Sequence, residues 1–296
     1  MLLDKGKKMK KIIERLLIFF VGIPVLFALV FLLPHCRHLA FNVAVVLFSA
    51  VGALELSNMF RKKNIGICKA EAVILGSLAP LTAVFQVCFN FPGWIIPLVI
   101  MAGVSWILLS LSFTSLKNMD NVFNSTAGRF TVMIYPSFLL FWIVKMSVWE
   151  LSGAIFLFLL IVFFNDGSAW FFGNLFGKNN RGLIPASPNK SMAGFIGGFI
   201  ASITIPVTAA VFFPSVFYAN NGETVFSSPV YAAVILGLFT GIFATLGDLA
   251  ESAIKRSCDV KNSGRIFMER GGILDSVDSI GAAAPVFFLI YNLLFF

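Results

Sequence analysis

The sequence has little charge for its length: Asp, Glu, Lys and Arg make up 12% of the 296 residues. An average soluble domain is about 25% charged and about 45–50% apolar. This chain is instead 58% hydrophobic, contains 35 Phe, and has a mean hydropathy of +0.92. The shortage of charge excludes an ordinary soluble domain and indicates a membrane protein with several spans.

Cysteine and histidine are also scarce, with four and two residues, and the cysteines form no C-x-x-C pair. This excludes a disulfide-rich scaffold and the usual zinc frameworks. One small cluster remains, His35, Cys36 and His38, which has no second cluster to complete a metal site. A polar turn between two helices explains it better than a bound metal.

Long apolar runs are plentiful, and they are continuous rather than alternating, which favours helices over barrel strands. The chain is therefore predicted to be all-α, a polytopic membrane helical bundle of about nine transmembrane helices. The predicted spans are 13–34, 39–60, 70–90, 93–114, 129–147, 150–165, 192–214, 229–250 and 279–296. We expect one integral membrane domain over 1–296, with N-terminal membrane helices over 1–160 and a C-terminal half over 161–296.

The basic residues predict the orientation of these spans, because Lys and Arg accumulate on the cytoplasmic side. With nine spans and a cytoplasmic N-terminus, 20 of the 22 basic residues fall inside, and only Arg37 and Lys145 fall outside. The net charge of +8 thus reports topology, and no nucleic-acid partner is needed to explain it. Two cytoplasmic segments, 165–191 and 251–278, are too patterned to be simple connectors.

Eleven charged residues lie within 247–285, between two apolar spans. Charge beside lipid is costly, so such a cluster favours a functional site. If the eighth span continues inward to about Cys258, Asp248 and Lys255 share a helix face, and Asp275 and Asp278 lie one turn apart on the next helix. Three carboxylates would suit Mg²⁺. The alternative is an ionic collar in which these Asp side chains pair with nearby Lys and Arg.

Gly271 and Gly272 precede the last predicted helix, where backbone can approach a ligand closely and free amides can bind an anion. An ordinary turn is the alternative. Ser187 and Lys190 lie just before the seventh span and offer a turn and a cation. Here the alternative is a basic anchor at the membrane surface.

Together the two segments resemble the phosphatidate cytidylyltransferase (CDP-diacylglycerol synthase) family. That family has the pattern S-x-x-K-R, four residues, K-D, and later H-G-G-x-x-D-R-x-D. The matching residues are Ser252, Lys255, Arg256, Lys261, Gly271, Gly272, Asp275 and Asp278, preceded by G-D-L-x-E-S at 247–252 and followed by D-S-x-x-A-A-x-P at 278–285. The earlier segment matches at Asn165, Asp166, Ala169, Gly173, Phe176, Gly177, Lys178, Ser187, Pro188, Lys190 and Gly194.

The resemblance implies a nucleotidyltransferase that converts CTP and phosphatidic acid into CDP-diacylglycerol and pyrophosphate with Mg²⁺. By resemblance, Asp248, Asp275 and Asp278 would hold the metal, and Lys255, Arg256, Lys261 and Asp278 would act in catalysis. The substrates would be bound by Ser187, Lys190, Ser252, Arg270, Gly271 and Gly272. The enzyme would lie in a bacterial inner membrane, with its active site facing the cytoplasm, and could form a homodimer.

The chain departs from the family pattern at four positions. Asn262 replaces an Asp, Arg270 a His, Ser276 an Arg, and Ala193 the Glu of T-W-E-G. These changes keep open the alternative of a catalytically inactive homologue that binds lipid. An enzyme that uses CTP with another lipid phosphate is a further alternative, because nothing in the sequence discriminates among lipid acceptors. A transporter is disfavoured, because the charges gather at one membrane face and the two halves show no symmetry.

Overall fold

The computed structural model describes residues 20–113, 121–217, 228–264, 266 and 271–295. Within these residues the chain forms helices and no named strand, which confirms the all-α prediction. The principal helices are α2 (His35–Arg61), α3 (Lys69–Phe89), α4 (Ile95–Ser112), α5 (Val122–Val132), α6 (Leu139–Met146), α7 (Ser152–Phe176), α8 (Met192–Phe212), α9 (Pro229–Ser257) and α10 (Leu274–Phe295).

Eight helical stretches in the described residues are long and apolar enough to cross a membrane, and Val122–Trp149 counts as one of them. A shorter apolar helix, Phe20–Leu32, corresponds to the first predicted span, whose start lies outside the described residues. The predicted count of about nine therefore agrees with the structure. Large apolar side chains such as Leu98, Met101 and Phe212 are exposed on these helices, as expected of surfaces that face lipid.

Two helices extend beyond their predicted ends. The apolar run of α7 stops at Asn165, but the helix continues to Phe176. It does so because Asn165 is buried and satisfied by α9: its amide donates to the Gly241 carbonyl at 3.5 Å, and Thr245 Oγ1 donates to its Oδ1 at 3.4 Å. Likewise α10 begins at Leu274 rather than 279. As a result, the motif residues Asp166 and Asp275 both lie on helices.

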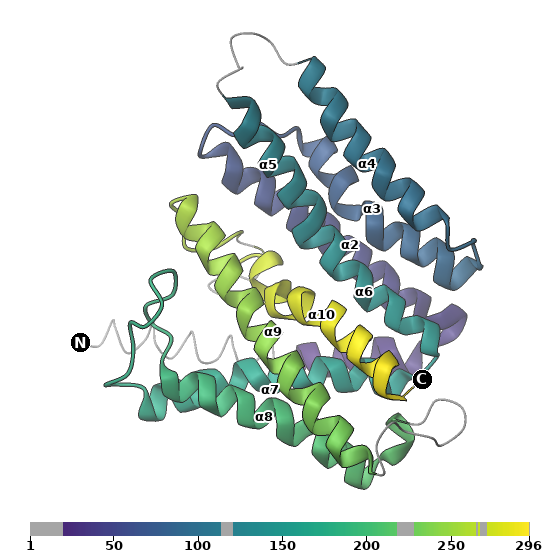
Figure 1. The fold of residues 1–296 in the computed structure, drawn as a ribbon, viewed down its shortest axis with the longest axis vertical. Coiled ribbons are helices and arrows are strands. Elements are labelled where there is room, and N and C mark those ends of the chain that lie inside the picture. The colour runs from purple at the N-terminus through teal and green to yellow at the C-terminus, as the bar shows by residue number, and fades with distance from the viewer. Residues whose placement is uncertain (1–19, 114–120, 218–227, 265, 267–270, 296) are drawn as a thin grey trace. The chain divides into compact units, whose positions relative to one another are not determined.

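The chain divides into two compact units. The first contains residues 1–137 and 260–276, so part of the second motif segment belongs to it. Its helices α2, α3, α4 and α5 lie alongside one another (Figure 1). Glu71 of α3 joins two neighbours, because its Oε1 accepts hydrogen bonds from Arg129 Nε of α5 at 2.7 Å and Trp106 Nε1 of α4 at 3.2 Å.

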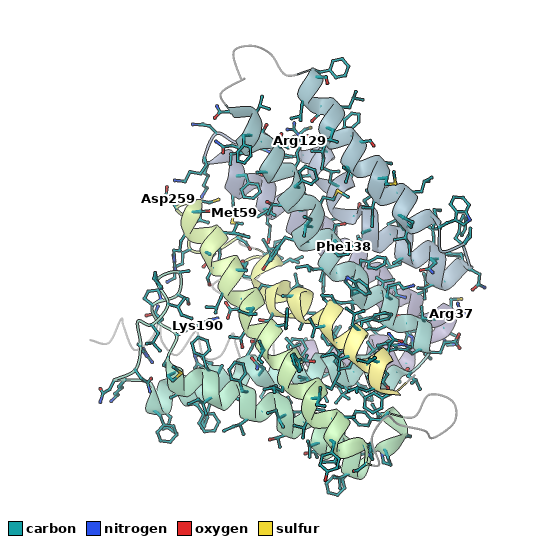
Figure 2. The ribbon with its side chains drawn as sticks, in the orientation of Figure 1. Arg37, Met59, Arg129, Phe138, Lys190 and Asp259 are labelled. Atoms are coloured by element: carbon teal, nitrogen blue, oxygen red, sulfur yellow. The ribbon has the colours of Figure 1, made fainter. Side chains whose placement is uncertain are left out.

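The second unit contains residues 138–259 and 277–296. Here α8 packs against both α7 and α9 (Figure 1). The end of α10 is held by aromatic contacts: the Trp149 and Tyr291 rings lie 4.5 Å apart, and Trp149 Nε1 donates to Asn292 Oδ1 at 3.1 Å. A turn-rich segment, 177–191, joins α7 to α8 and carries Lys190, which is labelled in Figure 2.

Candidate active site

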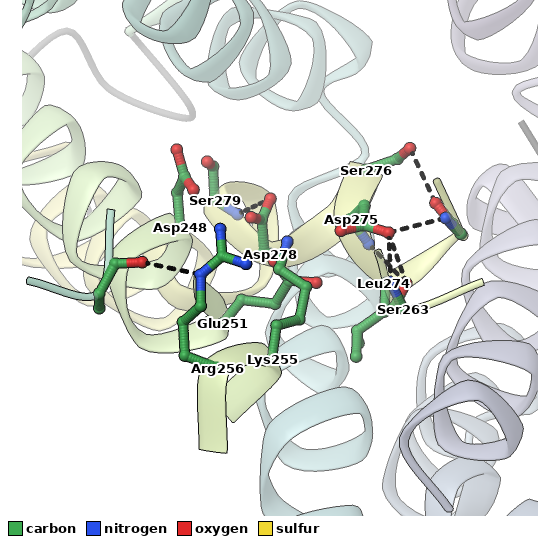
Figure 3. Close-up of polar contacts among 12 residues, drawn as sticks. Asp248, Glu251, Lys255, Arg256, Ser263, Leu274, Asp275, Ser276, Asp278 and Ser279 are labelled. Carbon is green, nitrogen blue, oxygen red and sulfur yellow. Dashed lines mark hydrogen bonds and ion pairs between the residues drawn. The ribbon is translucent and has the colours of Figure 1, made fainter. Parts of the chain in front are cut away.

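Four carboxylates from three helices of the second unit form an acidic cluster around Asp278 of α10, and Figure 3 shows three of them, Asp248, Glu251 and Asp278. Asp278 is 8% exposed and interacts electrostatically with Asp248 and Glu251 of α9 and with Asp166 of α7. Its Oδ1 accepts a hydrogen bond of 2.7 Å from the Ser279 amide. Like charges in such a cluster repel one another, and nearby cations offset this repulsion.

Gly247 explains how α9 and α10 come together at this cluster. A Cβ added at Gly247 would lie 2.5 Å from both the Asp278 carbonyl oxygen and the Ala282 Cβ. Only glycine permits this approach, and it places the next residue, Asp248, beside Asp278. The glycine of the G-D-L-x-E-S pattern therefore has a packing role that serves the cluster.

Two lysines supply positive charge to the acidic cluster. Lys190 Nζ lies 2.6 Å from Asp248 Oδ2, with the two side chains 22% and 34% exposed. Lys255 forms an ion pair with Glu251 one turn earlier on α9. Sequence predicted both lysines as site residues, and the structure places both at the same cluster. Such pairs also agree with the predicted alternative of an ionic collar, although the partly exposed pair of Lys190 and Asp248 is weak and can exchange partners.

Backbone hydrogen bonds in the segment before α8 hold the backbone of Lys190 in place. The Lys190 amide donates to the Ser187 carbonyl at 3.1 Å, and Ser191 caps α8 by accepting from the Gly194 amide at 3.1 Å. Arg256 contacts the same segment, with its Nε donating to the Ala186 carbonyl at 3.4 Å. Arg256 and Ser187 thus belong to one neighbourhood with the acidic cluster.

The donor set of the acidic cluster fits Mg²⁺ in its chemistry. Magnesium prefers oxygen ligands and commonly uses one or two carboxylates, with phosphate and water completing the shell. Asp248 and Asp278 would supply two carboxylates. Among the described residues, no three His, Cys, Asp or Glu side chains are arranged as a complete metal site. The predicted ligand set of Asp248, Asp275 and Asp278 therefore stays a prediction.

Asp275 lies in the first unit, in a different arrangement of polar groups (Figure 3). Its Oδ2 accepts three hydrogen bonds, from Ser263 N at 2.8 Å, Ser263 Oγ at 2.7 Å and Gly272 N at 2.8 Å. One carboxylate oxygen is therefore occupied by the protein itself. If Asp275 binds a metal, its Oδ1 would be the ligand.

The amides at the start of α10 have acceptors within the chain. Ile273 N and Leu274 N donate to Glu55 of α2, at 3.1 and 2.9 Å. Gly271 has φ +121°, and a Cβ there would collide with the Asp275 carboxylate, while one at Gly272 would collide with Glu55. The backbone amides of residues 272–274 therefore already have carboxylate acceptors within the protein. Substrate binding by these glycines stays a prediction.

The remaining predicted residues are dispersed. Ser252 is half-buried on α9, and Lys261 is exposed in the segment between α9 and α10. Arg270 lies outside the described residues. Of the departures from the family pattern, Asn262 is exposed, and Ser276 Oγ donates to the Gly272 carbonyl at 3.3 Å, so Ser276 supports the turn rather than supplying a cation.

Sequence reasoning assigned no role to Asp166, Glu251 or Glu55, although all three are ionisable residues within or beside apolar runs. An acid in such a place indicates function by default. That signal was present for each: Asp166 and Glu251 belong to quoted motif patterns, and Glu55 lies inside the predicted span 39–60. Their connection to the motif residues required the structure.

A sequence model of the cytidylyltransferase family matches residues 13–294, nearly the whole chain. The chain belongs to the cytidylyltransferase family. Curated relatives agree. A phosphatidate cytidylyltransferase from Staphylococcus saprophyticus is 31% identical over 195 residues, covering 66% of this chain and 70% of the relative. Proteins of the same name from Staphylococcus haemolyticus and Staphylococcus aureus are 38% identical over 128 residues, covering 43% of this chain and 44% of each.

Membership in the cytidylyltransferase family confirms the resemblance predicted from the two motif segments. It also extends the match to the N-terminal helices, where hydropathy alone suggested it. The family assignment therefore covers Glu55 and Asp275 as well as the acidic cluster.

Proposed function

We propose that this protein transfers the cytidylyl group of CTP to phosphatidic acid, giving CDP-diacylglycerol and pyrophosphate. The observation that carries the proposal is the cytidylyltransferase match over residues 13–294, together with relatives named phosphatidate cytidylyltransferase. The acidic cluster supports it, because carboxylates and lysines gather where the family motifs lie.

In the proposed reaction, a phosphate oxygen of phosphatidic acid attacks the α-phosphorus of CTP. A new P–O bond forms, the bond between the α-phosphorus and the bridging oxygen breaks, and pyrophosphate leaves. No protein nucleophile is required, because positioning and charge stabilisation carry most of such a transfer. Asp248 and Asp278, with Asp275, would hold Mg²⁺, which when bound neutralises charge on the phosphates of CTP.

Lys190 and Lys255 are the cations that we expect to bind the phosphates of the substrates. Each is paired with a carboxylate of the acidic cluster. When phosphate enters, Lys190 can exchange its carboxylate for a phosphate oxygen at little cost, because its partly exposed ion pair with Asp248 is weak. Lys255 would exchange at a greater cost, because its partner Glu251 is buried. Arg256 and Lys261 would add charge for the departing pyrophosphate.

The location of the reaction follows from its lipid substrate and from the charge distribution. The spans make this an integral membrane protein, and we propose that it lies in a bacterial inner membrane with the acidic cluster facing the cytoplasm. The predicted excess of Lys and Arg on that side supports this orientation. A homodimer is also proposed, and cross-linking in native membranes would test it.

The decisive experiment is CDP-lipid formation by purified protein in detergent, with phosphatidic acid, labelled CTP and Mg²⁺. We expect product from the wild type and its loss in Asp275→Asn, with labelled CTP still bound. Product from another lipid phosphate alone would reassign the acceptor. Well-folded protein that yields no product with several lipid phosphates and divalent metals would favour the inactive homologue, to which the four departures from the family pattern point.

A further inference from the structure

Glu55 is a buried acid whose hydrogen-bond partners, among the residues that the structure describes, all come from a distant part of the chain. It lies on α2 and is 6% exposed. Its Oε1 accepts from Ile273 N at 3.1 Å and its Oε2 accepts from Leu274 N at 2.9 Å, while Ser263 Oγ lies 2.9 Å from Oε2. A buried carboxylate is costly unless such donors satisfy it, so these contacts determine whether Glu55 can occupy this place.

Ser263 connects Glu55 to Asp275. Its Oγ lies within hydrogen-bond distance of carboxylate oxygens from both acids, and its amide donates to Asp275. Glu55, Ser263 and Asp275 thus form one network, which we call the Glu55 cap. All three belong to the first unit, as do the Gly271–Gly272 turn and the first residues of α10.

The Glu55 cap also explains why small residues surround the carboxylate. A Cβ at Gly264 or Gly272 would collide with Glu55. The backbone at Gly264 and at Gly272 therefore lies directly against the Glu55 carboxylate. At the start of α10, Glu55 supplies acceptors to helix amides that have no partner within the helix.

We propose that Glu55 is a positioning residue for the active site: it fixes the turn that begins α10 and so holds Asp275 in place. This inference rests on the proposed function only in naming Asp275 as part of the catalytic site. Glu55 acts through the backbone of residues 272–274 and through Ser263.

Glu55→Gln separates this role from simple packing, because glutamine keeps the shape of the side chain. Its single carbonyl oxygen can serve only one end of the network. In either orientation, the NH₂ group then faces a backbone N–H, at Ile273 or at Leu274, and that amide loses its acceptor. Glu55→Asp keeps the charge but shortens the reach, so it should restore part of what Gln loses.

The first measurement is amide hydrogen exchange by mass spectrometry on the full-length protein in detergent, without substrate. In Glu55→Gln we expect residues 271–276 to exchange roughly tenfold faster or more, as the loss of charge-assisted hydrogen bonds implies. Peptides from α3 should be unchanged, which shows that the fold is intact. Glu71→Gln is the matched control, because it removes a partly buried acid of the same unit that pairs with Arg129.

The second measurement is turnover of labelled CTP with phosphatidic acid by the same variants. We expect kcat of Glu55→Gln to fall about tenfold or more, with a smaller change in KM for CTP, and Glu55→Asp to be intermediate. Unchanged exchange at 271–276, full activity in Glu55→Gln, or an equal loss in Glu71→Gln would each overturn the proposal. A wild type that makes no product would refute the proposed function, while the exchange comparison would still decide whether Glu55 holds the turn.

Discussion

The two groups of carboxylates in this protein are satisfied in opposite ways. In the Glu55 cap, Glu55 and Asp275 accept hydrogen bonds mainly from backbone amides. In the acidic cluster, Asp248 and Glu251 instead pair with the side chains of Lys190 and Lys255. Backbone amides are fixed in place, whereas lysine side chains can move. The first arrangement is suited to holding structure, and the second to exchanging ligands.

The largest expected effect comes from removing charge at the centre of the acidic cluster. We expect Asp278→Asn to lower kcat about a hundredfold or more, because it removes a carboxylate proposed to hold Mg²⁺. Initial rates with labelled CTP at several Mg²⁺ concentrations would measure this. Asp259→Asn removes an exposed acid just after α9 and should remain near wild-type activity. An Asp278→Asn enzyme with wild-type kcat would remove Asp278 from the site.

The next effect concerns the Glu55 cap, where stability rather than turnover should respond first. A methyl group at Gly272 would collide with the Glu55 carboxylate. We therefore expect Gly272→Ala to lower the free energy of unfolding by about 1–3 kcal/mol. Thermal unfolding in detergent would detect it as a lower Tm. Gly66→Ala adds the same methyl group where no atom lies within 4 Å, and its Tm should not change.

A smaller effect is expected from the cations of the acidic cluster. Lys190→Ala should raise KM for CTP about tenfold, the loss expected of one partly exposed charge-assisted contact to phosphate. Lys190→Arg should retain part of the affinity. Lys62→Ala, which removes an exposed lysine just after α2 that belongs to neither motif segment, serves as the control. Equal KM values for Lys190→Ala and wild type would show that Lys190 only balances Asp248.

The sequence predicted the helices well, because helices depend on local patterns. Of the acidic cluster it named Asp248 and Asp278, but it missed Asp166 of α7 and Glu251 of α9. Apolar runs gave the spans, and helical spacing gave the continuation of α9 to Ser257 with Lys255 near the carboxylates. The end of α7 was missed, because the burial of Asn165 depends on α9. Glu55 was missed for the same physical reason: its donors lie 208 to 219 residues away, where no periodicity reaches.

The distance in sequence between Glu55 and its donors also sets an order of events during synthesis. Residues 260–276 complete the first unit, yet they are made after nearly all of the second. Until they emerge, Glu55 has none of the amides that satisfy it in the finished protein. The first unit therefore lacks residues 260–276 through most of translation. A fragment ending at residue 137 would leave the Glu55 carboxylate without those donors.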